Sequence, residues 1–277
     1  MALVVIPLAV AIVLALVLGT GGGRRAPSAA HAVPPRARRP LLRRSTPIAA
    51  EELRTDERIL SYTSYVWLGT RHRRDVALTF DDGPGPFTLR ILAALERFHA
   101  RATFFEIGRE VRAHPRITQR LARAGMVVGD HTEHHPQLAL LRSERQAAEI
   151  DQAARAIRAA GAPWPALFRP PYGSFDSATL GLLRSRRMLM ALWTVDTRDY
   201  ASPGVRRIVY AALSGARPGA IILFHDGGGD RSQTLAALPR VLERLRQRRY
   251  RLVTLPELLQ DDPPPGGQPP PRSLAGD

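Results

Sequence analysis

The sequence predicts an α/β fold, either a barrel or an open sheet of parallel strands. Short apolar runs alternate with stretches of helical period between about residues 74 and 260. Strands separated by helices imply parallel pairing with right-handed crossovers. Polar residues that can carry chemistry follow nearly every predicted strand, and in parallel α/β folds active sites form at that edge.

Hydrophobic periodicity predicts the individual elements. Apolar runs predict strands over residues 76–80, 102–105, 126–129, 167–168, 188–195, 220–224 and 252–253. Stretches with a helical period predict helices over residues 87–98, 111–124, 142–160, 177–185, 205–213 and 235–248. The helix over 142–160 is the longest, with Ile150 and Ile157 on its apolar side.

Composition excludes several classes of protein. The chain has 277 residues, of which 44% are hydrophobic, so it can bury a core and is not disordered throughout. It contains no cysteine, which excludes a disulfide scaffold, a cysteine nucleophile and a thiolate metal site. Any metal must therefore be held by His, Asp or Glu.

The net charge of +15 does not by itself indicate a nucleic-acid partner. The sequence has neither lysine nor asparagine, so arginine supplies all of its 40 basic residues. Arginine has replaced lysine everywhere, including positions where the charge serves only solubility, and this suggests a coding bias. We expect no nucleic-acid partner.

Residues 1–23 are the predicted membrane anchor or signal segment, with an almost unbroken apolar run over residues 1–19 that is followed by glycines and then by Arg24 and Arg25. The length of this run lies between a signal-peptide core and a short membrane-spanning helix. We favour an uncleaved membrane anchor over a cleaved signal, because the small-residue site Ala30-His31-Ala32 lies far beyond the apolar run. The following arginines alone would place the C-terminal part in the cytoplasm, but we give this signal little weight, because a misassigned start codon could have removed charges upstream of the apolar run.

The remaining chain divides into three parts. We predict that residues 24–73 form a basic Pro/Arg-rich linker. Residues 261–277 contain two Pro-Pro-Pro runs, and we predict that they form a disordered tail. Residues 74–260 form the predicted folded domain.

Two motifs indicate a metal site. Asp81 and Asp82 stand together where the first strand stops, and adjacent carboxylates need a cation or separate tasks. His131 and His135 follow the third strand, and a spacing of four allows both imidazoles to face one ion. Two histidines and one carboxylate leave a coordination position for water, as in catalytic sites. Taken singly, Asp-Gly-Pro is also ordinary turn chemistry, and the histidines fit a polar loop.

Three further strand ends carry polar groups. Arg169 begins a stiff Pro-Pro turn that directs the Tyr172 N–H towards a possible ligand. Asp199 lies beyond the fifth strand, and His225 ends the sixth, where a neighbouring carboxylate would make the imidazole a general acid. Five such strand ends in one chain are an improbable accident.

These five segments, in this order, resemble the motifs of the polysaccharide deacetylases, carbohydrate esterase family 4, which share the NodB-homology domain. The matching stretches are Thr79 to Gly83, His131-Thr132-x-x-His135, Arg169-x-Pro171-Tyr172, Trp193 with Asp196-x-x-Asp199, and Leu223-x-His225. The resemblance covers residues 74–260. It implies a distorted (β/α) barrel and a divalent metal, usually zinc.

The resemblance also implies a role for each matching residue. Asp82, His131 and His135 would bind the metal, and Asp81, paired with Arg169, would be the base. The Tyr172 N–H would stabilise the oxyanion, and His225, held by Asp199, would protonate the leaving nitrogen. The acetyl group and sugar would bind against Trp193, Leu223, Pro171 and Tyr172.

Two positions depart from the family pattern. Tyr200 stands where tryptophan is common, and Asp130 stands where asparagine often precedes the first histidine ligand. We expect the first to alter the groove wall and the second to add negative charge near the metal.

The predicted function is removal of N-acetyl groups from an amino-sugar polymer, with peptidoglycan or a related envelope polysaccharide preferred. The alternatives are chitin deacetylation, esterase action on acetylated xylan, or a non-catalytic arginine-rich envelope-binding protein. We expect a monomer whose partners are an acetylated polysaccharide and, through the N-terminal segment, a membrane. The expected location is outside the cell, either membrane-anchored or secreted.

Overall fold

The computed structural model describes residues 58–268. The predicted anchor at 1–23, the linker up to residue 57 and the tail from residue 269 lie outside these residues. Within the described range, no helix is both long and apolar enough to span a bilayer.

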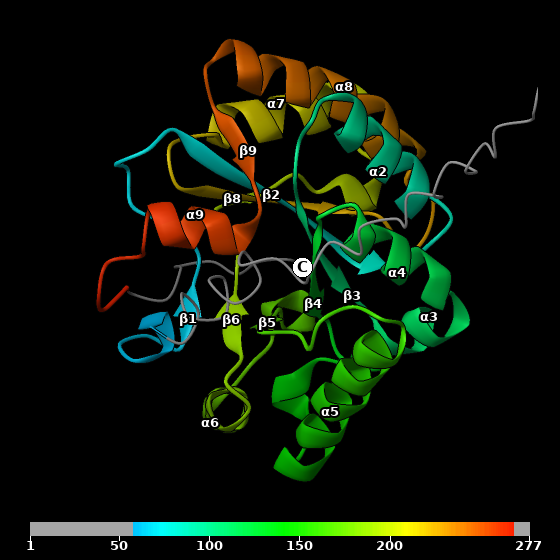
Figure 1. Ribbon diagram of the computed structural model, residues 1–277, viewed down its shortest axis with the longest axis vertical. Helices are drawn as coiled ribbons and strands as arrows, with labels where there is room; N and C mark the ends of the chain where they lie inside the picture. The colour runs from blue at the N-terminus through cyan, green and yellow to red at the C-terminus, as the bar shows by residue number, and fades with distance from the viewer. Residues whose placement is uncertain (1–57, 269–277) are drawn as a thin grey trace, which may run out of the picture. The chain divides into compact units, whose positions relative to one another are not determined.

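The described residues contain a curled sheet in which nine strands pair in parallel (Figure 1). Its strands are β1 (Tyr65–Val66), β2 (Asp75–Gly83), β3 (Thr103–Glu106), β4 (Val127–Asp130), β5 (Leu167–Phe168), β6 (Leu189–Ala191), β7 (Val195–Asp196), β8 (Ala220–His225) and β9 (Arg251–Val253). The order is β1-β6-β5-β4-β3-β2-β8-β7, and β9 pairs with β2. β1 and β7 end this order without pairing to each other, so the sheet is a half-barrel. This confirms the predicted α/β class and distorted barrel.

Helices surround the sheet, and α2, α7 and α8 lie together on one side (Figure 1). They are α2 (Thr88–Arg97), α3 (Gly108–Ala113), α4 (Pro115–Arg123), α5 (Ser143–Ala159), α6 (Ser177–Ser185), α7 (Val205–Gly215), α8 (Ser232–Gln247) and α9 (Leu255–Asp261). Three short 3₁₀ turns, η1 (Leu138–Leu140), η2 (Pro171–Gly173) and η3 (Asp199–Ala201), lie in loops.

Two predicted elements differ from the structure, and two observed elements were not predicted. The helix expected over 111–124 is wrong in outline, because His114 leaves the helical region at φ −132° and Pro115 starts a new helix. The strand expected over 188–195 is two strands, β6 and β7, which lie far apart in the sheet order. The sequence patterns predict neither β1 nor α9.

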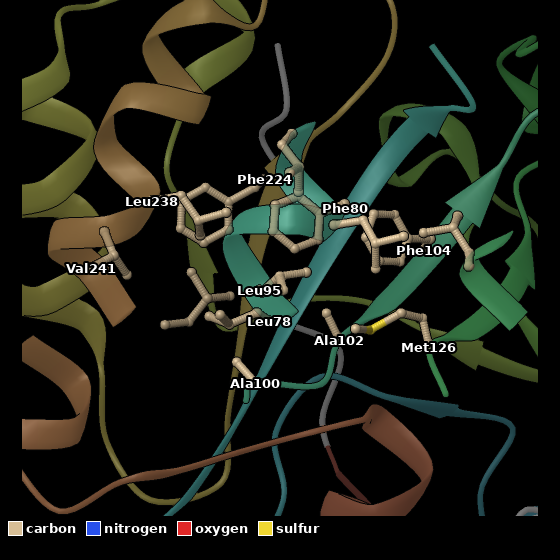
Figure 2. Packing of buried hydrophobic residues seen from close by; sticks show 14 of the residues in the cluster. Leu78, Phe80, Leu95, Ala100, Ala102, Phe104, Met126, Phe224, Leu238 and Val241 are labelled. Carbon is tan, nitrogen blue, oxygen red and sulfur yellow. The ribbon is translucent and has the colours of Figure 1, made fainter. Parts of the chain in front are cut away.

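Strand β2 is the centre of the core. It pairs with β3, β8 and β9, and its residues from Asp75 to Asp81 are all buried. Phe80 stacks between Phe104, with ring centroids 5.0 Å apart, and Phe224, at 5.6 Å (Figure 2). These contacts fix the strand whose last residues enter the site.

The two ends of the described chain pack against each other. Tyr65 donates a 2.6 Å hydrogen bond from its hydroxyl to the Gln268 carbonyl, and the Gln268 side chain donates one of 2.6 Å to the Leu68 carbonyl. Asp262 accepts hydrogen bonds from the backbone N–H groups of His72 and Arg73. From residue 58 onward, the predicted linker is therefore part of the folded body, as is the predicted tail up to residue 268.

Candidate active site

Asp81 and Asp82 end β2, and the backbone sends their side chains to different partners. The pairing with β3 shifts register between Asp81 and Gly83, and Asp82 has a positive φ of 73°. Asp81 Oδ1 accepts a 2.8 Å hydrogen bond from Arg169, whereas Asp82 Oδ1 faces two histidines. Asp81 Oδ2 still lies 3.8 Å from His131 Nε2, so the two carboxylates border the same site but have different main partners.

Asp82, His131 and His135 form a cluster with the geometry of a metal site. Asp82 Oδ1 lies 3.1 Å from His135 Nε2 and 3.5 Å from His131 Nε2, and the three ligand atoms lie within 4.8 Å of one another. Ligands about 2.0 Å from a tetrahedral ion lie about 3.3 Å apart. Asp82 Oδ1 is also buried without a hydrogen-bond partner. These residues therefore fit a divalent ion.

Neighbouring groups orient both imidazoles. His131 Nδ1 lies 2.7 Å from the Arg169 carbonyl, which can only accept, so this nitrogen carries the proton and Nε2 keeps its lone pair for an ion. His135 Nδ1 lies 3.2 Å from the Tyr172 hydroxyl. His135 and Tyr172 both have positive φ values, 64° and 58°. Strained backbone of this kind is characteristic of functional sites.

The electrostatics favour an ionised Asp82. Burial by itself would raise the pKa of Asp82, but the two histidines, together with the charge of His225, hold it well below its usual range. The neighbouring Asp130 behaves differently. Burial raises the pKa of Asp130 well above its usual range, and its Oδ1 accepts a hydrogen bond from the Thr132 N–H. The negative charge expected from Asp130 is therefore disfavoured, and this side chain instead shapes the turn that carries His131.

Arg169 is a fully buried cation beneath the site. It donates to Asp81 Oδ1, to the Thr79 hydroxyl, and to the backbone carbonyls of Ala191 and Leu192. Burial lowers the pKa of Arg169, although the Asp81 carboxylate opposes this effect. A buried charge with this many partners holds Asp81 rigidly.

His225, at the end of β8, is held by Asp199. Its Nδ1 lies 2.7 Å from Asp199 Oδ1, and its backbone N–H donates to Asp199 Oδ2 at 2.8 Å. Burial by itself would lower the pKa of His225, but the charge and hydrogen bond of Asp199 outweigh it and raise the pKa to about 9. The imidazole is thus protonated at neutral pH and can act as an acid.

Asp81, Asp82, the two histidines and His225 line one pocket, whereas Arg169 and Asp199 are buried behind it. Its lining residues are Asp81, Asp82, Ile107, Arg109, His131, His135, Pro170, Tyr172, Trp193, Asp196, Tyr200, Leu223, His225 and Gly228. Trp193 and Leu223 lie on its wall as expected. Pro170 lines the pocket, whereas Pro171, the expected substrate contact, is buried in η2. Tyr200 packs edge-on against His225, with ring centroids 5.2 Å apart.

Sequence reasoning missed two residues of this site. Thr234 on α8 donates a 2.7 Å hydrogen bond to Asp199 Oδ2, and nothing in a helical threonine 35 positions away indicates that contact. Arg109 lines the pocket just beyond β3. A signal existed for Arg109, because it follows a predicted strand closely and so lies at the same edge of the sheet as the other polar groups.

Comparison with known proteins shows the family. The model of the polysaccharide deacetylase family matches residues 69–190. A peptidoglycan-N-acetylglucosamine deacetylase of Bacillus cereus is 37% identical over 208 residues, which cover 73% of this chain and 96% of that protein. The chain belongs to the polysaccharide deacetylase family. This confirms the resemblance drawn from the motifs, and with it the deacetylase activity class of carbohydrate esterase family 4.

Other members show the range of the family. A chitooligosaccharide deacetylase of Bradyrhizobium sp. is 39% identical over 198 residues, covering 67% of this chain and 90% of that protein. The crystal structure of a peptidoglycan N-acetylglucosamine deacetylase in complex with a substituted N-oxidanyl-benzamide has a TM-score of 0.70 and 31% identity, covering 75% of this chain and 96% of the other. A family 4 pseudoenzyme from Bacillus anthracis has a TM-score of 0.66 and 30% identity, covering 70% of this chain and 68% of the other.

Proposed function

We propose that this deacetylase is a metal-dependent hydrolase that removes N-acetyl groups from an amino-sugar polymer of the cell envelope, with peptidoglycan as the preferred substrate. The observation that carries the proposal is the convergence of three units on one pocket: the Asp82-His131-His135 cluster, Asp81 held by the buried Arg169, and His225 held by the buried Asp199. The named activities of the relatives, on peptidoglycan and chitooligosaccharides, support it.

Asp82, His131 and His135 would hold the ion, with zinc as the expected metal. A bound divalent ion supplies Lewis acidity, which polarises the amide carbonyl and lowers the pKa of a water molecule. The protein supplies the remaining parts of the reaction. Arg169 occupies Asp81 Oδ1, which leaves Oδ2 to take the proton of the attacking water.

The leaving group needs an acid, because an amide nitrogen leaves poorly without a proton. His225 donates that proton from Nε2 while its Nδ1 stays bonded to Asp199. The Tyr172 N–H would donate to the oxyanion that forms on the carbonyl oxygen. Trp193 and Leu223 would enclose the acetyl methyl group.

Two alternatives use the same pocket. Chitin deacetylation and removal of O-acetyl groups from xylan need the same ion, base and acid. A non-catalytic role has a precedent of fold in the pseudoenzyme relative. Against that role, every ionisable residue of the proposed mechanism is present here, in hydrogen-bonded pairs or in the ligand cluster.

The test is acetate release from defined peptidoglycan, chitin and acetylxylan fragments, with and without a chelator. Chelation should abolish acetate release, and added zinc should restore it. His131→Ala should lose bound metal and activity together, whereas Asp81→Asn should keep the metal, measured by elemental analysis, and lose at least about 100-fold in kcat. Full activity in both variants would refute the assigned roles. Acetate release from none of the fragments under any metal would refute the proposed function.

The N-terminal segment provides the proposed location. An apolar segment followed by a basic linker is consistent with a domain exported to the envelope, where peptidoglycan is found. Fractionation of cells into membrane, medium and cytoplasm, followed by immunodetection, would test this location.

A further inference from the structure

Arg109 lines the catalytic pocket, and contacts with neighbouring segments hold its backbone in place. The Gly108 N–H donates to the Thr132 carbonyl, and the Arg109 N–H donates to the Glu133 carbonyl. A Cβ at Gly108 would lie 2.2 Å from Glu133 Oε2 and 2.7 Å from the Ala153 backbone, so the chain is tightly enclosed here. The loop that carries His131 therefore also fixes the position of Arg109.

The guanidinium group of Arg109 is accessible to solvent, and one of its nitrogens already donates a hydrogen bond within the protein. Arg109 Nε donates a 2.9 Å hydrogen bond to Glu110, and the arginine side chain is 52% exposed. This ion pair uses one edge of the planar group. The outer N–H groups remain in a geometry suited to a bidentate carboxylate.

Charge is distributed unevenly over the pocket. Arg109 is the sole arginine among the described residues that line it. It follows β3, whereas Asp196 ends β7, and β2 and β8 intervene between those strands. Asp81 and Asp82 lie between them, Asp81 paired with the buried Arg169 and Asp82 facing His131 and His135. A substrate that spans the carboxyl edge of the sheet thus meets a cation near β3 and a carboxylate near β7.

We propose that Arg109 is a specificity-determining residue that binds a carboxylate carried by the sugar polymer next to the acetamido group being hydrolysed. The inference rests on the proposed function and narrows its substrate class to acidic glycans. Peptidoglycan offers such carboxylates on its stem peptides and, where a stem peptide has been removed, on the lactyl group of muramic acid, whereas chitooligosaccharides are neutral. Arg109 lies outside the reacting atoms, so it acts through substrate binding and changes KM more than kcat.

The experiment compares tetrasaccharides of equal length with the metal-loaded full chain. One substrate is chitotetraose, and the second is a peptidoglycan tetrasaccharide with free lactyl carboxylates. The third is that tetrasaccharide with its lactyl carboxylates converted to methylamides, and the fourth carries stem peptides. Comparing kcat/KM for the free-carboxylate and methylamide tetrasaccharides isolates the effect of the lactyl carboxylate. The tetrasaccharide with stem peptides tests the peptide carboxylates as the alternative source.

Arg109→Gln should lower kcat/KM on the tetrasaccharide with free lactyl carboxylates on the order of 10-fold. The loss should be mainly in KM, because the variant loses a charged hydrogen bond to the substrate at a half-exposed site. The change on chitotetraose and the methylamide should stay below about 3-fold. Arg109→Glu should enlarge the loss on the carboxylated substrate. Arg116→Gln is the matched control, because Arg116 is exposed on α4 and does not line the pocket. That variant should leave the ratio between substrates unchanged.

The outcomes separate the two proposals. Equal losses on all substrates in Arg109→Gln, or no loss on any, would overturn the role of Arg109 while leaving the deacetylase function intact. No acetate release by the unaltered protein from any tetrasaccharide would instead count against the proposed function. A carboxylate preference that fades as salt rises, in the unaltered protein but not in Arg109→Gln, would support the inference.

Discussion

At the scale of single residues, the site works by giving similar groups different surroundings. Asp81 is bonded to a buried arginine, and Asp82 faces two imidazoles. Asp199 is bonded to an imidazole and to Thr234, and burial raises the pKa of Asp130. These different surroundings support the four roles proposed for the carboxyl groups: Asp81 as base, Asp82 as ligand, Asp199 as support for the acid and Asp130 as a turn-forming residue.

The acid gives a pH prediction. The pKa of His225 is raised to about 9, so its proton is present at neutral pH and is lost as the pH rises through that value. Asp199→Asn removes the carboxylate that stabilises the imidazolium, so the pKa of His225 should fall. The basic limb of the kcat profile should therefore move to lower pH by about 1 to 3 units, with kcat at its optimum reduced by about 100-fold or more.

The measurement is kcat against pH between 5 and 10, with metal content checked at each end. Thr234→Val is the matched control, because it removes a hydrogen bond to Asp199 but keeps the charge beside His225. Its basic limb should move less than that of Asp199→Asn. A basic limb that stays in place in Asp199→Asn would show that His225 is not the group titrating there.

At the scale of elements, β2 connects the core to the chemistry. Its buried apolar residues pack on both sides of the sheet, and near its end stand the proposed base, Asp81, and the proposed metal ligand Asp82. β8 lies beside it in register, with Asp81 opposite His225. Because the strands are parallel, the groups at their carboxyl ends meet without any loop having to fold back.

The stack on β2 gives a stability prediction. Phe80→Ala removes a fully buried ring from between Phe104 and Phe224 (Figure 2). We expect the free energy of unfolding to fall by about 3–5 kcal/mol, measured by urea denaturation of the full chain. Leu140→Ala, at a residue that is 78% exposed, should change it by less than about 0.5 kcal/mol. Equal effects in the two variants would contradict the stack as a centre of stability.

At the scale of the described domain, the two ends of the chain complete the body that carries the site. β1 adds to the sheet beside β6, and Leu255, Leu258 and Leu259 of α9 enter the same core cluster as Ile59. Gln268 joins these ends, because its side chain accepts from the Trp67 N–H and donates to the Leu68 carbonyl. Contacts across about 200 positions therefore hold the two ends of the described chain together.

Gln268→Ala tests these contacts between the two ends of the described chain. Loss of the two hydrogen bonds should lower the free energy of unfolding by about 1–3 kcal/mol. It should also speed hydrogen exchange at the Trp67 amide, measured by mass spectrometry, while amides in β2 change little. Gln247→Ala, at an exposed glutamine of α8, should leave both readouts unchanged. Unchanged exchange at Trp67 in Gln268→Ala would show that other contacts hold these ends.

The sequence by itself determined the fold class, most of the elements and the residues that could carry chemistry. Period-two and period-3.6 patterns are local, and parallel strands place their polar carboxyl ends at one edge. Asp81, Asp82, His131, His135, Arg169 and His225 could therefore be identified from their positions along the chain. Adjacent Asp81 and Asp82 could not be told apart from spacing alone, although the family motifs implied their separate roles.

Only the tertiary structure decided which groups touch. The register shift after Asp81, the support of Asp199 by Thr234, the place of Arg109 in the pocket and the packing of β1 with residues up to 268 all depend on contacts between distant parts of the chain. β1 has two residues and the chain at 262–268 is proline-rich, so neither has a period long enough to read. Both segments are held in place by contacts with partners about 200 residues away, and no local sequence pattern encodes such contacts.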